Sequence, residues 1–180
     1  MRLEHGVQVR HNGADEPFDK VVFAVPPGQV LRLVGDPTPY EQSRFGAWKD
    51  NVATTFIHSD AAIYRPYGIS SASPFDFFEV PTGWGYNAYL NDLCGVASGK
   101  PYYLSYNIES IVDKASIVHR QQHLTPFYTK AAFKYREEII ATNGENHTFH
   151  AGAYLGDGLH EGAILAAKRV VGLVGSKMVK

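Results

Sequence analysis

Four glycines near the C-terminus are the residues whose type and spacing most suggest chemistry. They occupy positions 152, 156, 158 and 162, between an apolar segment and an Ala-rich segment. Glycine permits positive φ and lets a backbone approach a ligand closely. A helix starting near Glu161 would present free N–H groups and a partial positive charge, which suit an electron-rich oxygen or a phosphate. The stretch from His147 to Gly175 therefore predicts a strand, a ligand-binding turn and a helix.

This turn does not match the fingerprint of an independent dinucleotide-binding fold. The spacing of Gly156, Gly158 and Gly162 is one residue too long for G-x-G-x-x-G. Only 18 residues follow Gly162, which leaves no room for a second parallel strand bearing a ribose-binding acid. We therefore expect the turn to be the last strand–helix step of a larger cofactor domain.

The histidines offer one candidate for catalysis. His160 lies inside the turn, where it could donate a hydrogen bond to a ligand or act as an acid–base group. It could equally be a helix-start residue that bonds to backbone, and both interpretations stay open. His119 and His123 would share one face of a strand, but no third ligand accompanies them. A hydrogen-bonded or solvated pair is favoured, and we expect no metal site.

Neither the aromatic residues nor any common catalytic motif identifies a further functional site. Tyr86, Asn87 and Tyr89 could line a substrate wall, but aromatics are common in strands and plain sheet packing is favoured. The sequence contains no G-x-S-x-G, P-loop or paired-Cys zinc pattern. Hydrolase and phosphotransferase functions therefore have no support.

The segments that must position the turn have parallel-sheet character at both ends of the chain. Residues 21–25 form an apolar run bounded by prolines, which is typical of a strand covered on both faces. Residues 27–36 predict a short helix, and Thr38 with Glu41 forms a capping-box pattern that predicts another. Two parallel pieces alone cannot close a stable sheet, so we expect a missing N-terminal portion.

The middle of the chain has a different character. Between Ala53 and Leu124, β-rich segments separated by Gly, Pro, Ser and Asn predict an antiparallel sheet rich in Tyr and Phe. A helix is expected over residues 129–142, with Gly144 as its stop. The fold class expected is α/β, with α+β character overall.

Composition limits the possible partners and compartments. The chain is 44% apolar and 19% charged, as globular proteins are. Its net charge is −1 without a stripe of Lys or Arg, which argues against nucleic acid as a partner. Cys94 is the only cysteine, which favours a reducing compartment. There is no apolar leader and no run of eighteen apolar residues, so we expect a cytoplasmic protein without a membrane span.

Several motifs together resemble a known flavoprotein family. FHAGAYLGDGLHEGAILAA resembles the C-terminal flavin motif of amine-oxidase-type oxidoreductases, and FDKVVFAVPPGQVLRLV resembles the strand-plus-proline segment of the same family. With DPTPYEQSRFGAW, FIHSD and WGYNAYLNDL, the chain resembles a subgroup of predicted NAD/FAD-binding oxidoreductases over residues 6–175.

The resemblance implies roles for residues of the turn. Gly152 and Ala153 would approach the ribityl–phosphate part of FAD. Glu161, Gly162 and Ala163 would open the helix whose N–H groups face the pyrimidine edge of the flavin. Many relatives carry an acid where this chain has Ala153, so that side-chain contact is absent.

The resemblance also implies cofactor contacts outside the helix start. Ala24, Val25 and Pro26 would lie near the adenosine side, and Gly158 would belong to the cofactor turn. The glycine-rich N-terminal unit that grips the dinucleotide in the family is absent from the sequence. We therefore expect weak or absent FAD binding by the chain alone, and no turnover.

The resemblance implies a C-terminal fragment of a larger enzyme. Residues 1–40 and 145–180 would belong to a partial FAD-binding, Rossmann-like domain, and residues 41–144 to an inserted, antiparallel β-rich substrate-domain segment. The parent enzyme would transfer hydride from a small organic substrate to FAD. The expected macromolecular partner is a second copy or a missing N-terminal half. The alternative is a non-catalytic ligand-binding or self-assembling module.

Overall fold

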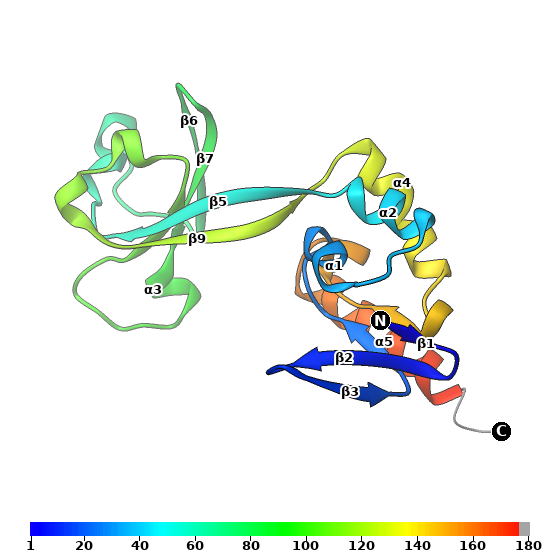
Figure 1. Ribbon diagram of the computed structural model, residues 1–180. Coiled ribbons are helices and arrows are strands. Elements are labelled where there is room, and N and C mark those ends of the chain that lie inside the picture. Colours follow the sequence, from blue (N-terminus) through cyan, green and yellow to red (C-terminus); the bar gives the residue numbers. More distant parts are fainter. Residues whose placement is uncertain (177–180) are drawn as a thin grey trace. The chain divides into compact units, whose positions relative to one another are not determined.

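The computed structural model describes residues 1–176, which form two compact units (Figure 1). Unit 1 contains residues 1–51 together with the described residues from 125 onward. Unit 2 is Val52–Leu124. Strands β5 (Lys49–His58) and β9 (Ile117–Phe127) each have residues in both units. Unit 2 is therefore an insertion whose two ends are carried by neighbouring strands of one sheet.

Two small sheets form the strand part of unit 1. An antiparallel sheet contains β1 (Arg2–Leu3), β2 (Gly6–His11) and β3 (Ala14–Phe18). Its tight turn uses Asn12 and Gly13, both with positive φ, as two-residue hairpin loops require. The second sheet pairs β4 (Val21–Phe23) in parallel with β10 (Thr148–His150). The predicted strand at residues 21–25 is thus present but shorter.

Unit 1 contains four helices among the described residues, and two of them, α2 (Pro39–Gly46) and α4 (Lys130–Ala141), begin at a threonine whose side chain caps the helix. The others are α1 (Pro27–Leu33) and α5 (His160–Ser176), with the short 3₁₀ turns η4 (Glu145–His147) and η5 (Ala153–Leu155). At α2, Thr38 Oγ1 accepts the Glu41 N–H and the Glu41 carboxylate accepts the Thr38 N–H. The predicted capping box is confirmed, as is the helix expected over 129–142.

The core of unit 1 joins these helices to β10. Its buried members are Val30, Phe45, Trp48, Ala132, Ile139, Phe149, Ala151, Tyr154, Leu155, Ala166 and Val170. Helix α5 contributes Ala166 and Val170, one turn apart on the same face. Its other side also carries apolar residues, including Val171 at 71% exposure. Among the described helices, none is long and apolar enough to cross a membrane.

The domain boundaries differ from those expected from the sequence. Most of α2 and all of α4 lie within the predicted substrate-domain segment 41–144, yet both helices pack in unit 1. Phe45 of α2 and Ile139 of α4 belong to the same buried cluster as Phe149 of β10. Because those contacts join segments far apart in the sequence, no local pattern reveals them.

Unit 2 is built on a five-stranded sheet with the order β6-β7-β8-β5-β9. Its remaining elements are β6 (Phe75–Val80), β7 (Gly83–Tyr89), β8 (Tyr103–Tyr106), α3 (Leu90–Leu93), η1 (Ala62–Tyr67), η2 (Glu109–Ile111) and η3 (Lys114–Ser116). Pairs β6–β7, β7–β8 and β5–β8 are antiparallel, as predicted for this segment. One sheet face packs on a cluster that includes Phe56, Phe78 and Ile108.

A buried polar chain crosses the interior of unit 2. His58, Asn87 and Ser105 are each 0% exposed. His58 Nε2 lies 3.1 Å from Asn87 Oδ1 and 2.9 Å from Ser105 Oγ. Asn87 Nδ2 donates to the Tyr64 hydroxyl, which donates to Asp76, both at 2.8 Å. Burial lowers the pKa of His58 and raises that of Tyr64, so both rings are held neutral.

Candidate functional site

The parallel pair β4–β10 brings the two halves of the predicted cofactor site to one edge. Phe23 pairs with His150, and the Ala151 N–H donates to the Phe23 carbonyl at 3.0 Å. Residues 24–26 and 152–153 therefore leave the sheet side by side, at the carboxyl ends of both strands. In open α/β sheets, ligands bind outside this edge.

A compact turn follows β10. The Gly152 carbonyl accepts the Leu155 N–H at 3.1 Å. The Ala153 carbonyl accepts two amides, those of Gly156 at 2.9 Å and Gly158 at 3.0 Å. These bonds reverse the direction of the backbone within a few residues, and α5 begins directly after the turn.

The glycines of this turn allow it to pack closely on the rest of unit 1. A Cβ on Gly156 would lie 2.6 Å from the Cα of Gly162, so the turn touches the start of α5. Gly158 has a φ of +85°, and its Cβ would lie 2.9 Å from the Tyr128 hydroxyl. The chain's own packing thus accounts for both glycines without a ligand.

Asp157 occupies the helix start that was expected to face the flavin. Its Oδ1 accepts the N–H groups of Leu159 at 2.8 Å and Gly162 at 3.0 Å. The Ala163 N–H donates to the Leu159 carbonyl at 3.1 Å. The amides of Gly162 and Ala163 are therefore already engaged within the chain. A flavin oxygen reaching Gly162 would have to replace a carboxylate.

Two arginines that the sequence did not single out hold the turn. Arg136 Nη1 of α4 donates to the Gly156 carbonyl at 2.9 Å. Arg169 Nη1 of α5 donates to the Leu155 carbonyl at 3.2 Å. Neither arginine carries a local signal for this role, because each is distant in sequence from its acceptor. Asp157 was detectable in principle, since an Asp shortly before a helix is a common capping residue.

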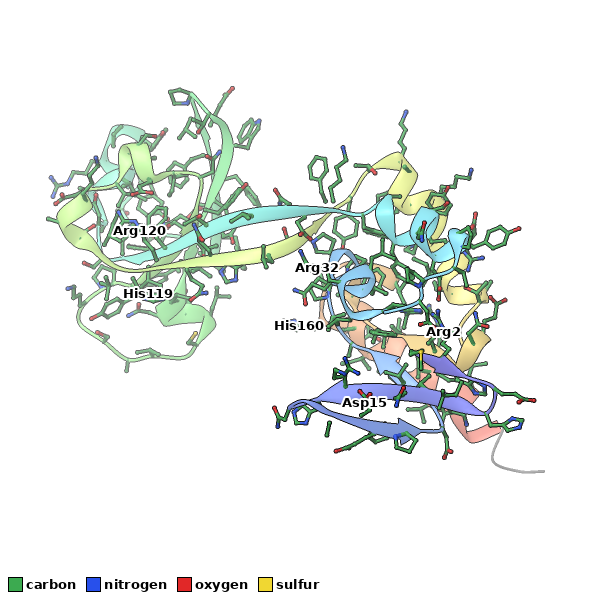
Figure 2. The ribbon with its side chains drawn as sticks, in the orientation of Figure 1. Arg2, Asp15, Arg32, His119, Arg120 and His160 are labelled. Carbon is green, nitrogen blue, oxygen red and sulfur yellow. The ribbon has the colours of Figure 1, made fainter. Side chains whose placement is uncertain are left out.

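His160 is the first residue of α5 and is exposed, as is the adjacent Glu161 (Figure 2). Within the described part of the chain its imidazole has no hydrogen-bond partner. The structure thus shows no side-chain bond from His160 to the backbone of the described residues, and a role toward a ligand stays a prediction.

The residues expected near adenosine have different environments. Ala24 is exposed directly after β4, whereas Val25 packs against the core of unit 1. The Pro26 carbonyl accepts the Gln29 N–H at 2.9 Å and so starts α1. Ala24 is the member of this group most accessible to a ligand.

The histidine pair on β9 is not assembled with further metal-binding side chains. His123 Nε2 lies 2.9 Å from Thr55 Oγ1, which confirms the hydrogen-bonded interpretation for that residue. Among residues 1–176, no group of three or more His, Cys, Asp or Glu side chains could hold a metal ion.

The suggested aromatic wall is divided between the two faces of its sheet. Asn87 is buried in the polar chain of unit 2, and Tyr89 packs against the hydrophobic cluster. Tyr86 lies on the opposite face, where its ring stacks on Tyr106 at 5.9 Å. Sheet packing, the favoured interpretation, thus accounts for Asn87 and Tyr89.

Solved structures share this fold, although sequence comparison finds no relative. No protein-family model matches the chain, and no curated protein shows significant similarity to it. A cofactor-binding redesign of putrescine oxidase, a triple mutant, matches 97% of the chain with a TM-score of 0.64 and 12% identity. Wild-type putrescine oxidase bound to putrescine matches 96% with a TM-score of 0.61 and 11% identity.

Two proteins with other names have the same fold. A putative protoporphyrinogen oxidase from Exiguobacterium sp. 255-15 matches the whole chain with a TM-score of 0.53 and 11% identity. A fatty acid isomerase from P. acnes that produces CLA matches 84% of it with a TM-score of 0.54 and 14% identity. The chain spans less than half of each matched protein, from 40% to 47%. The chain therefore has the fold of the corresponding part of these oxidases and this isomerase.

Proposed function

We propose that the chain is the C-terminal part of a flavin-dependent oxidoreductase. The observation that carries the proposal is the meeting of residues 24–26 and 152–153 at the carboxyl ends of one parallel strand pair. The fold shared with putrescine oxidase over 97% of the chain supports it, and favours an oxidoreductase over a self-assembling module. The exposed edge beyond Ala24 and Ala153 would face FAD.

In this proposal FAD supplies the chemistry by accepting hydride from an organic substrate, while the protein orients the reactants. Gly152 and Ala153 provide a backbone edge without bulky side chains. Asp157, Arg136 and Arg169 keep the shape of that edge through the hydrogen bonds described above. Unit 2 is the substrate-domain segment. The residues that grip the adenine dinucleotide would come from polypeptide outside this sequence.

The purified 180-residue chain is expected to be colourless and to lack oxidase turnover, since it contains only one wall of the site. A flavin absorbance band that survives gel filtration would contradict this expectation.

Weak recognition of the cofactor is testable by NMR. Millimolar FAD is expected to shift the amide signals of Ala24, Gly152 and Ala153. Ala24→Glu should weaken this response, because it adds a larger, negatively charged side chain on the adenosine side of a negatively charged cofactor. Ala167→Glu, on an exposed position of α5, is the matched control. Shifts that appear elsewhere in the chain while Ala24, Gly152 and Ala153 stay unmoved would show the proposed edge to be wrong.

A further inference from the structure

Strand β6 is an edge of the unit 2 sheet that the rest of the described chain leaves unpaired (Figure 1). It pairs with β7 on one side and with no strand of residues 1–176 on the other. Its sequence is FDFFEV, in which Phe75 is 54% exposed and Phe77 is 70% exposed. An exposed, apolar edge strand is a template for pairing with another chain.

The other sheet edges among residues 1–176 carry protection that β6 lacks. Strand β3 has the sequence ADEPF, with Pro17 and two acidic residues. Strand β9 contains Pro126 and Arg120, whose Nη2 lies 2.6 Å from Glu109 Oε1. Strands β1, β4 and β10 have only two or three residues each. Proline, basic side chains and shortness keep sheet edges from pairing, and β6 has six residues without proline, lysine or arginine.

The two acidic residues of β6 lie on opposite faces of the sheet. Asp76 points to the core side, where its Oδ2 accepts the Tyr64 hydroxyl at 2.8 Å and the Ser73 N–H at 3.0 Å. Glu79 lies on the other face and is exposed. Because like charges opposite each other destabilise a strand pair, these two positions limit the register in which a second β6 can pair.

The hydrogen bonds with β7 determine which backbone groups of β6 face outward. The Pro74 carbonyl accepts the Tyr89 N–H at 3.1 Å. In an antiparallel pair, hydrogen-bonded positions alternate along the ladder. With the register of β6 and β7, the residues of β6 that bond to β7 are Asp76, Phe78 and Val80. The N–H and C=O groups that point away from β7 are therefore those of Phe75, Phe77 and Glu79.

The exposed face of the sheet carries a row of aromatic side chains that ends at β6. Phe77 lies opposite Tyr86, and Tyr86 lies opposite Tyr106. The Tyr86 and Tyr106 rings stack with centroids 5.9 Å apart, and the Phe75 ring meets Tyr86 edge-on at 6.4 Å. Phe77 is the outermost ring of this row, so an aromatic ring added beyond β6 would continue it.

We propose that β6 pairs with β6 of a second copy of the chain, antiparallel and about a two-fold axis at Phe77. Phe77 then lies opposite its counterpart, and Phe75 of each copy lies opposite Glu79 of the other. The outward-facing residues of both strands form the hydrogen-bonded pairs. The result is one continuous sheet, with an aromatic row made by Tyr86 and Phe77 of both copies.

Charge selects this register over its neighbours. An axis at Asp76 would place two carboxylates opposite each other in the closely spaced, non-hydrogen-bonded position. An axis at Phe78 would place each Phe77 opposite Glu79 and leave Phe75 beyond the end of the partner strand. With the axis at Phe77, the two Glu79 side chains lie about 13 Å apart along the strands. That separation exceeds the screening length of about 8 Å at physiological salt.

The expected interface is of the weak, transient kind. A single strand with its flanking side chains falls in the class of small interfaces, below about 1,200 Å² in total. We expect a dissociation constant of about 10–100 µM. The proposal rests on unit 2 alone and is independent of flavin binding, which involves residues of unit 1.

Sedimentation velocity of the full 180-residue chain tests the association. We expect the sedimentation coefficient to rise between about 1 µM and about 500 µM. Phe77→Lys should raise the dissociation constant at least about tenfold, because two ammonium groups would meet at the axis. Phe18→Lys, at the 48% exposed end of β3, is the matched control and should associate as the unmodified chain does. A chain that stays monomeric, or equal dissociation constants for the two variants, would overturn the proposal.

Disulfide trapping tests the register. Cys94→Ser removes the only cysteine of the chain and provides the background. Phe77→Cys should then form a linked dimer on mild oxidation, since opposed residues have Cα atoms about 5.5 Å apart, within disulfide range. Phe75→Cys is the control, because its counterpart lies about 13 Å away along the strands. Cross-linking through Phe75→Cys that is as fast as through Phe77→Cys would show the register to be wrong.

Discussion

At the scale of single residues, His150 couples the stability of unit 1 to pH. Burial, assisted by the positive charges of Arg2 and Arg44, lowers its pKa to about 4 in the folded chain, against an ordinary value of 6.5. Between these values the unfolded chain binds a proton that the folded chain does not. The stability contributed by the neutral ring is therefore present above pH 6.5 and is lost progressively as the pH falls toward 4.

His150→Phe is expected to reduce this pH dependence. Phenylalanine keeps the ring packing against Phe23 and Phe45 and removes the unsatisfied Nδ1. From pH 7 to pH 5, the variant should lose about 2 kcal/mol less unfolding free energy than the unmodified chain, by proton linkage. Urea unfolding at both pH values measures the difference. His5→Gln, which alters a histidine that is 89% exposed, serves as the control. An unchanged pH dependence in His150→Phe would contradict the assignment.

Gly162 and Gly172 offer a matched pair of substitutions on α5. A Cβ at Gly162 would lie 2.4 Å from Asp157 Oδ1 and 2.8 Å from the Asp157 nitrogen, whereas one at Gly172 meets nothing within 4 Å. Gly162→Ala should destabilise the protein by about 1–3 kcal/mol through overpacking. Gly172→Ala should stabilise it by about 0.5–1 kcal/mol, since alanine is the better helix residue.

Chemical denaturation of both glycine variants measures these opposite effects. If Gly162→Ala were as stable as Gly172→Ala, the conclusion that the turn packs tightly against the start of α5 at Gly162 would be wrong. The comparison also separates packing from cofactor binding, because no flavin is needed for the loss.

At the scale of elements, the buried polar chain of unit 2 ties β5, β7 and β8 to η1. Tyr64 is central, since it accepts from Asn87 and donates to Asp76, both at 2.8 Å. Tyr64→Phe removes one oxygen, which leaves the buried Asn87 Nδ2 without its acceptor and leaves Asp76 Oδ2 with the Ser73 N–H. We expect a loss of about 1–3 kcal/mol in unfolding free energy. Tyr67→Phe, which changes an exposed tyrosine of the same turn, is the control. Equal stability of the two variants would show that the buried polar chain contributes little to the unfolding free energy of unit 2.

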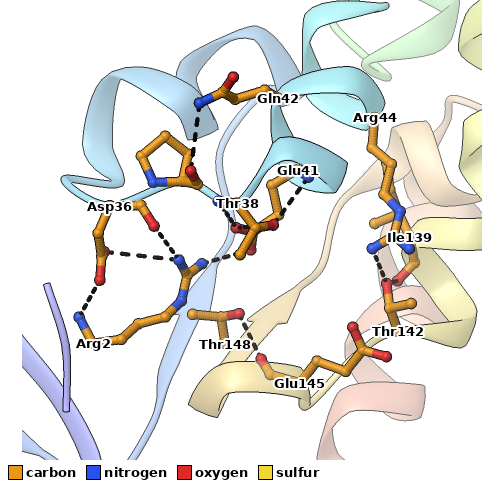
Figure 3. Close-up of polar contacts among 11 residues, drawn as sticks. Arg2, Asp36, Thr38, Glu41, Gln42, Arg44, Ile139, Thr142, Glu145 and Thr148 are labelled. Atoms are coloured by element: carbon orange, nitrogen blue, oxygen red, sulfur yellow. Dashed lines mark hydrogen bonds and ion pairs between the residues drawn. The ribbon is translucent and has the colours of Figure 1, made fainter.

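Local patterns predicted elements well and their assembly poorly. The Thr38–Glu41 capping box and the apolar run at residues 21–25 are local, and both led to correct elements. The membership of α2 and α4 in unit 1 depends on contacts such as Arg44 Nη1 to Thr142 Oγ1, across 98 residues (Figure 3). Such pairs have no signature in a single sequence.

The candidate site shows the same limit. The glycines and the helix after β10 were predictable from spacing. The residue type of Asp157 indicated a capping role, but its contact with Gly162 was not predictable, because side-chain geometry decides whether an aspartate turns back to the helix or points to solvent.

At the scale of the whole molecule, each unit has its own buried cluster. We therefore expect two unfolding transitions rather than one. Trp48 is buried in unit 1, and Trp84 lies in unit 2 with 64% exposure. In a Trp84→Phe variant, fluorescence reports unit 1 alone, while circular dichroism reports both units. Coincident fluorescence and circular dichroism curves would contradict separate transitions.

The two strands that connect the units have a consequence for the order of folding. Asn51 Nδ2 and Thr125 Oγ1 are 3.0 Å apart, so the ends of the insertion meet where it leaves unit 1. The parallel partners β4 and β10 lie on either side of that insertion in the sequence. Joining distant segments costs loop-closure entropy that rises with the length of free chain between them. An insertion that folds first shortens this free chain. Its folding therefore lowers the entropy cost of pairing β4 with β10.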